Sequence, residues 1–150
     1  MARYHASGSQ NLASSAITAL TIAAQSTAHR NEIYDINLGN VGAPADLVTL
    51  HTIQRITAVG TAGSSVTPAL LDLADRASQS AAGENHSSEP TYTSNTELLE
   101  IPLNHRATFR WVAAPDGYLI TPATNNSGIG AKALHASATT EWRVGCHWIE

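Results

Sequence analysis

The stretch that decides the predicted fold is residues 97–121, ELLEIPLNHRATFRWVAAPDGYLIT. Side chains alternate in its middle part, where Ala107, Phe109, Trp111 and Ala113 share one face. Such a period of two, with aromatic and β-branched residues, is typical of a half-buried strand. Phe109 is the only Phe and Trp111 is one of three Trp, so we expect this strand at the bottom of the core.

A tight turn should follow that strand at residues 115–117, Pro-Asp-Gly, with Pro starting the turn and Gly where a positive φ is cheap. Residues 118–121 then predict a returning strand before Pro122. The centre of the protein is therefore predicted to be a β-meander rather than a helix or a catalytic loop.

The end of the chain gives the second strong pattern, over Glu141–Ile149. One face of this predicted strand carries Trp142, Val144, Cys146 and Trp148. A strand with two inward Trp residues should lie in the middle of a sheet. The single Cys146 excludes a disulfide within one chain and is expected to be a small buried apolar residue.

Further strands are predicted from weaker patterns. Their ranges are 16–24, 32–38, 47–59 with a bulge near Thr52, 91–93, and, least clearly, 132–140. Residues 68–77 are the best candidate for a helical turn, because Pro68 suits a helix start. Residues 39–46, 60–68, 78–90 and 123–130 are predicted loops, and residues 1–10 a short N-terminal arm or edge strand.

These elements predict an all-β fold, a jelly-roll-like antiparallel β-sandwich of about eight strands with at most one short helix. A length of 150 residues suits a single domain, 1–150. Charged residues make up 13%, against about 25% in typical domains. Two interpretations stay open: a surface covered by partner subunits, or a Ser/Thr-coated soluble β-protein.

The charge pattern excludes some partners. The net charge is −4, Lys132 is the only Lys, and no basic run exists, so nucleic acid is not an expected partner. No apolar run approaches the roughly 18 residues of a membrane helix, so no membrane is expected either. The weakly apolar residues 13–24 favour a strand over a secretory segment, which predicts a protein made in the host cytoplasm and not exported.

No residue pattern predicts chemistry: catalytic, cofactor-binding and metal-binding residues are each predicted to be none. Folding could bring His105 and His147 together, but no two His residues have the sequence spacing of metal ligands. Cys146 and His147 cannot act as a nucleophile and base pair, because adjacent residues of a strand point to opposite faces.

Other polar and aromatic residues give no specific signal. Carboxylate pairs could arise by chance from Asp35, Glu97, Glu100 and Asp116. Arg106 and Arg110 could reach carboxylates of another subunit or face solvent. Most of the four Tyr and three Trp are expected in strand cores rather than stacked on sugars.

Several segments resemble one family. They are residues 101–115 (IPLNHRATFRWVAAP), 89–93 (EPTYT), 120–130 (ITPATNNSGIG), 33–36 (IYDI) with the Gly-rich turn after it, and the opening MARY. In pieces covering most of the chain, they resemble small virion proteins encoded beside the major capsid protein of tailed bacteriophages. The resemblance carries no catalytic or shell-contact motif.

The resemblance implies a β-sandwich that decorates and cements the capsid, commonly as a trimer. The expected partners are the major capsid protein and the chain itself, and the expected location is the capsid surface of the virion. The N-terminal arm and the loops 78–90 and 123–130 would be the contact elements. Two alternatives stay open: a tail or head-fibre component that binds a host surface glycan, and an enzyme or metal-binding jelly roll outside a virus.

Overall fold

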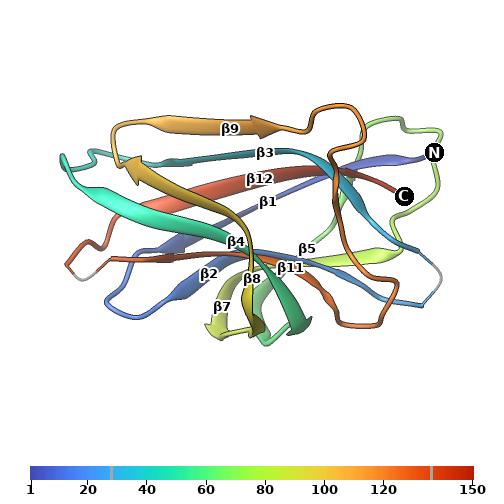
Figure 1. Ribbon diagram of the computed structural model, residues 1–150, viewed down its shortest axis with the longest axis horizontal. Coiled ribbons are helices and arrows are strands. Elements are labelled where there is room, and N and C mark those ends of the chain that lie inside the picture. Colours follow the sequence, from blue (N-terminus) through green and yellow to red (C-terminus); the bar gives the residue numbers. More distant parts are fainter. Residues whose placement is uncertain (28, 136) are drawn as a thin grey trace.

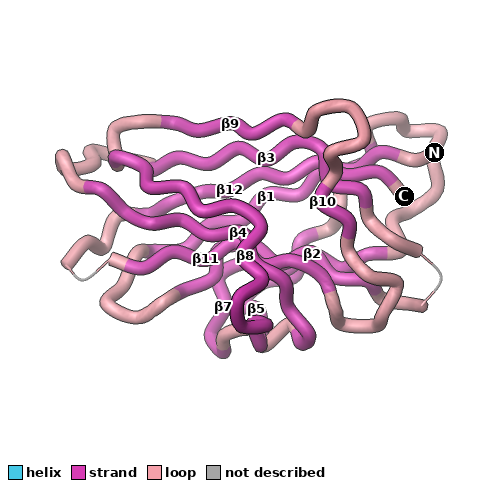
Figure 2. Tube along the Cα trace, viewed as in Figure 1, coloured by secondary structure: helices cyan, strands magenta, loops and turns pink. Residues whose placement is uncertain are grey.

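Two antiparallel sheets face each other in the computed structural model, which describes residues 1–27, 29–135 and 137–150 (Figures 1 and 2). The described residues contain strands and no helix. The strands are β1 (Arg3–Asn11), β2 (Ile17–Ala24), β3 (Glu32–Asn40), β4 (Val48–Ala58), β5 (Thr61–Val66), β6 (Ala69–Leu70), β7 (Ser80–Ser88), β8 (Thr91–Asn104), β9 (Thr108–Val112), β10 (Leu119–Ile120), β11 (Gly128–Leu134) and β12 (Glu141–Ile149).

Each sheet has six strands. Sheet A has the order β10-β3-β12-β1-β6, and β9 also pairs with β3. Sheet B has the order β5-β7-β2-β11-β4-β8. The two termini lie at the same end of the molecule (Figure 1), where the backbones of Ala2 and Glu150 exchange hydrogen bonds of 3.1 and 3.0 Å. The prediction of an antiparallel sandwich is confirmed, with twelve strands instead of about eight.

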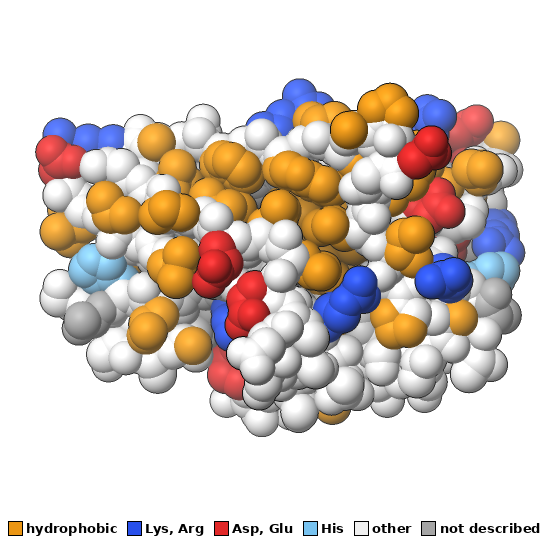
Figure 3. All heavy atoms as spheres, viewed as in Figure 1, with side chains coloured by type: hydrophobic (Ala, Val, Ile, Leu, Met, Phe, Trp, Pro, Cys, Tyr) orange, Lys and Arg blue, Asp and Glu red, His pale blue; other side chains and the backbone are white. Residues whose placement is uncertain are grey.

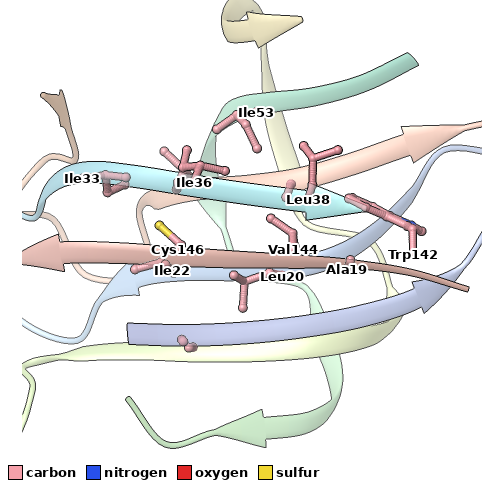
Figure 4. Close-up of a cluster of buried hydrophobic side chains, with 14 of the residues drawn as sticks. Ala19, Leu20, Ile22, Ile33, Ile36, Leu38, Ile53, Trp142, Val144 and Cys146 are labelled. Atoms are coloured by element: carbon pink, nitrogen blue, oxygen red, sulfur yellow. The ribbon is translucent and has the colours of Figure 1, made fainter. Parts of the chain in front are cut away.

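The core lies between the sheets, and β12 runs through its middle (Figure 4). Trp142 and Trp148 have no exposed surface, and Val144 and Cys146 are buried beside them. Facing residues from the two sheets, such as Ile36 of β3 and Ile53 of β4, meet in the same cluster. The prediction of a central C-terminal strand with a buried Cys146 is therefore confirmed.

One side of the sandwich is closed by β1, which contacts β7 and β2 of the opposite sheet. A Cβ atom on Gly8 of β1 would lie 2.3 Å from the carbonyl oxygen of Ala19, so only glycine permits this close approach. Two hydrogen bonds join the sheets here. The Ser9 amide donates to Glu84 at 3.1 Å, and the Gln10 amide group donates to the carbonyl of His86 at 3.3 Å.

Several segments predicted to be loops are strands. Residues 1–10, predicted to be an arm or an edge strand, form most of β1, which is a strand but lies between β12 and β6 rather than at an edge. The predicted loop 78–90 contains β7, between β5 and β2. The predicted loop 60–68 contains β5. Small polar residues dominate these segments, and backbone pairing with neighbouring strands, which needs no apolar alternation, holds them in the sheets. Residues 68–77 form β6 and turns rather than a helix, because Ala69 and Leu70 pair with β1.

The predicted β-meander is also wrong. The first of its strands is part of β8 and pairs with β4 in sheet B, whereas β9 and β10 both pair with β3 in sheet A. The tight turn is confirmed by a bond of 2.8 Å from the Gly117 amide to the Ala114 carbonyl. The positive φ, 62°, falls on Asp116 rather than on Gly117.

The weaker strand predictions are largely confirmed by β2, β3 and β4. The bulge expected near Thr52 occurs one residue later, between Ile53 and Gln54, in the pairing with β8. The predicted strand 132–140 begins earlier and ends earlier, as β11 at Gly128–Leu134. Its position Ala136 lies outside the described residues.

Candidate functional site

The side of the sandwich opposite β1 is open. Sheet A ends there with β9 and β10, sheet B ends with β8, and apolar side chains fill the space between these edges without being fully covered. We call this region the β8–β9 opening; it comprises the partly buried residues Leu98, Leu99, Ala107, Phe109, Trp111 and Leu119. Figure 3 shows hydrophobic atoms gathered across the middle of this face, between β9 and β8 of Figure 1.

Strand β9 supplies the two aromatic residues of the opening. Phe109 lies opposite Leu38 of β3, and Trp111 lies opposite Ile36, so both rings point towards the core. They remain partly exposed because β9 has a neighbour on one side only and no strand of sheet B covers it. The prediction that this strand forms the bottom of the core is therefore wrong: it forms the rim.

Polar groups surround the opening. The Arg55 guanidinium of β4 reaches across to the Ile120 carbonyl of β10 at 2.8 Å and ties the two sheets together at one point. Next to Arg55, the Gln54 amide group points to the outer face of sheet B, where it donates to the Thr93 carbonyl at 2.7 Å and to the Glu97 carboxylate at 3.0 Å and so ties β8 to β4. An apolar centre with a polar rim is the usual anatomy of a protein–protein interface.

The free backbone edges add a second feature. Both β8 and β9 have a partner strand on one side only, so each leaves backbone N–H and C=O groups available along its outer edge. Such edges accept an additional strand from another chain, with main-chain hydrogen bonds giving affinity and side-chain contacts giving specificity. The opening is therefore equipped for both apolar contact and strand addition.

A charged row crosses the outer face of sheet A. Asp35 of β3 accepts three hydrogen bonds from the Arg110 guanidinium of β9, the shortest being 2.6 Å, and its carboxylate lies 3.7 Å from a His147 ring nitrogen. The Arg110 bonds hold the pKa of Asp35 below its usual value. His147 contacts His5 with ring centroids 4.5 Å apart, and burial lowers the pKa of His5. Arg110 thus binds a carboxylate of its own chain while its side chain stays 67% exposed, as the solvent-facing alternative predicted; contact with another subunit stays a prediction.

The structure also shows the partners of the other residues considered in the sequence. His105 contacts His135, with ring centroids 5.4 Å apart, and not His147. Arg106 donates to the Pro44 carbonyl at 3.4 Å, and none of the carboxylates in the described ranges pairs with it. Cys146 is buried in the core while His147 lies on the outer face, as the strand geometry predicted.

A buried histidine lies near the end of the opening. His51 of β4 packs against Trp142 with ring centroids 4.8 Å apart, and neither of its ring nitrogens has a hydrogen-bond partner among the residues that the structure places. Burial is the main cause that lowers the pKa of His51 to about 4, helped by nearby His105, which bonds to Thr49. Among the residues that the structure describes, no group of three or more His, Cys, Asp or Glu side chains is placed to share a metal ion.

Sequence reasoning missed the opening itself. One signal was present: Leu98 and Leu99 are consecutive, which breaks the alternation of a strand with one solvated face, and both pack against the core because the register with β4 shifts between them. The aromatic prediction is only partly confirmed, since Tyr4, Trp142 and Trp148 are buried but Tyr34, Tyr118 and Trp111 keep exposed surface.

Comparison with known proteins gives no assignment: no family model, no curated protein and no solved structure matches the chain. Within the described ranges, none of the secondary structure is a helix of the length and apolarity needed to span a bilayer.

Proposed function

We propose that the chain is a structural virion protein, a decoration protein that cements the capsid of a tailed bacteriophage by bridging major capsid protein subunits. The observation that carries the proposal is the β8–β9 opening, an apolar surface bordered by the edge strands β8 and β9. The family resemblance of residues 101–115 supports it, because these residues build the end of β8 and all of β9.

The aromatic residues of the opening are suited to stable binding of another protein. Phe109 and Trp111 are aromatic anchors of the kind that carry most of the binding energy in protein interfaces. The backbone that carries these two residues is already held by pairing of β9 with β3, so binding would require little additional ordering of side chains or backbone. In this proposal the opening replaces the N-terminal arm and the segment 78–90 as the main contact, since both are committed to strands.

The strand order supports a jelly-roll assignment within this proposal. Sheet A contains the run β9-β3-β12-β1, and sheet B contains the run β8-β4-β11-β2. In both runs, strands from the first part of the chain alternate with strands from its last part. Jelly rolls are common among viral capsid and lectin domains, although a fold alone does not fix a function.

Cementing follows from contacts with several shell subunits at once. In a homotrimer, three copies of the opening would engage neighbouring capsid subunits, and linking these contacts would raise the overall affinity through effective concentration. The low share of charged residues, 13%, is consistent with a surface largely covered in the assembled particle.

The test combines solution mass with shell binding. We expect light scattering to give a trimer, and the protein to sediment with empty mature capsids and to raise the temperature at which they rupture. Replacing Phe109 and Trp111 by Ala should abolish co-sedimentation. The matched control is Leu73→Ala, because Leu73 is 90% exposed and lies outside the opening.

A folded protein that does not sediment with mature shells would contradict the proposal. So would a double variant that binds as well as the parent, because the opening would then not be the contact. Circular dichroism of each variant separates loss of binding from loss of fold.

A further inference from the structure

A second surface feature lies on the outer face of sheet A, next to the end that holds both termini. It is a hollow of about 300 Å³ lined by Arg3, Tyr34, Val112, Ala113, Tyr118 and Ile149. Its volume is at the small end of the range for ligand pockets, which suits a single ring rather than a long chain. The residues come from β1, β3, β12 and the end of β9, and from the turn between β9 and β10, so they are far apart in sequence.

The polar groups of this hollow are not engaged by the protein. In the described part of the chain, no hydrogen bond or ion pair engages the Arg3 guanidinium; the Arg3 backbone amide donates to the Asp75 carboxylate at 3.4 Å, and the Arg3 carbonyl accepts from the Leu71 amide at 3.0 Å. The hydroxyls of Tyr34 and Tyr118 likewise donate to no described residue. A cation and two hydroxyls therefore face a hollow whose remaining walls, Val112 and Ile149, are apolar.

We propose that this hollow binds a sugar ring that carries a carboxylate, such as a uronic acid. The guanidinium of Arg3 matches the planar carboxylate with two parallel hydrogen bonds. The rings of Tyr34 and Tyr118 offer apolar faces for the C–H groups of a pyranose and hydroxyls for its polar edge. A single cation balances one carboxylate, whereas a phosphate at neutral pH carries up to two charges.

The floor of the hollow is held in place before any ligand arrives. The ring of Tyr34 lies 6.0 Å from the ring of His147, which in turn lies beside Asp35 and its partner Arg110. Arg3 and Tyr34 line the same hollow, and burial raises the pKa of the Tyr34 phenol, which keeps its hydroxyl protonated. Prearranged groups of this kind reduce the entropic cost of binding.

The inference does not depend on capsid binding, because the hollow and the β8–β9 opening share no residues. The test is a titration of the ¹⁵N-labelled full chain with glucuronate, N-acetylneuraminate, glucose and inorganic phosphate, followed by amide chemical shifts. We expect glucuronate to shift amides around Tyr34 and Tyr118, with a dissociation constant about tenfold lower than that of glucose, a factor worth about 1.4 kcal/mol.

Two variants locate the site. Arg3→Gln should weaken glucuronate binding about tenfold, to the level of glucose, whereas Arg143→Gln should leave it unchanged. Arg143 is the matched control because it also extends from sheet A, but it is already paired with Glu141 at 2.9 Å. Tyr118→Ala should weaken glucuronate and N-acetylneuraminate alike, since the stacking surface is lost.

Four results would overturn the inference. They are no shifts with glucuronate up to tens of millimolar, equal binding of glucose, unchanged binding by Arg3→Gln in a variant whose spectrum shows a folded chain, and phosphate binding as tight as glucuronate binding. The last result would indicate an anion site without sugar selectivity.

Discussion

On one side of the sandwich, β1 lies so close to β2 that Gly8 has no room for a side chain; on the other, β9 and β8 leave Phe109 and Trp111 partly open to solvent. Both sides have the same antiparallel architecture. They differ in whether a strand of the opposite sheet covers the edge. The closed side packs strands of the two sheets against each other, whereas the open side leaves apolar side chains partly exposed, and under the proposed function these side chains would contact the partner.

The largest expected effect compares two Trp residues. Trp148 has no exposed surface and stacks on Tyr4 with ring centroids 5.7 Å apart, so Trp148→Ala should lower the free energy of unfolding by about 3–5 kcal/mol. Trp111→Ala in the opening should cost about 1 kcal/mol, because that side chain is already partly in water. Urea denaturation measures both values.

Equal losses would remove the distinction between the two sides. Should Trp148→Ala fail to fold, Trp148→Phe keeps the comparison measurable, with a smaller loss expected. In either case Trp111→Ala should be the variant that loses shell binding.

The next effect concerns acid. The pKa of His51 is about 4 in the folded protein against 6.5 when unfolded, so the unfolded chain binds this proton first. The His51 contribution is fully present above pH 6.5 and is lost as the pH falls towards 4, a decrease of about 3 kcal/mol. Urea midpoints between pH 7.5 and 4 should show this slope.

The variant His51→Leu isolates that contribution. It keeps an apolar side chain against Trp142 and removes two unpartnered ring nitrogens, so the acid-induced loss should shrink by about 3 kcal/mol without a loss at pH 7.5. If the dependence of unfolding free energy on pH were unchanged in the variant, other groups, such as His105 or Asp35, would be responsible for the loss of stability at low pH.

A smaller effect is expected at the closed side. In Gly8→Ala the new Cβ would lie 2.3 Å from the Ala19 carbonyl oxygen and 2.9 Å from the Cβ of Glu84, so the sheets must separate. We expect a loss of about 2 kcal/mol. Ser7→Ala, at the exposed neighbouring position, should change stability by less than about 0.5 kcal/mol. A neutral Gly8→Ala would mean that the closed side can widen freely.

The two sides also explain which parts of the fold could be predicted from the sequence. Strand β12 was predictable because its inward face, from Trp142 to Trp148, alternates without interruption. Strand β9 shows the same alternation of apolar and polar residues over fewer positions. This pattern indicates that one face of the strand is apolar, but it does not indicate whether the strand has a hydrogen-bonded neighbour on each side. The position of β9 at an edge depends on pairing with β3, some 70 residues earlier in the chain, which no local pattern records.

Polar strands were harder still. Segment Ser80–Ser88 reads as a loop because it contains Gly83 and Asn85, and Asn85 has a positive φ of 51° within the strand. Its position between β5 and β2 comes from backbone pairing. The candidate site was therefore missed for one physical reason. An opening exists where a strand has no hydrogen-bonded neighbour on one side, and strand pairing between distant segments cannot be predicted from local sequence patterns.

The smallest effect in energy is a local one, and it tests the comparison without any mutation. Amide hydrogens of β12, hydrogen-bonded to β1 and β3, should exchange only through global unfolding. Those of β9, which pairs with β3 alone, should exchange through local opening that costs about 1–2 kcal/mol less. If β9 exchanged as slowly as β12, the edge would be as rigid as the core. Slower exchange in β9, but not in β1, after binding to capsids would instead identify the open side as the surface that the partner covers.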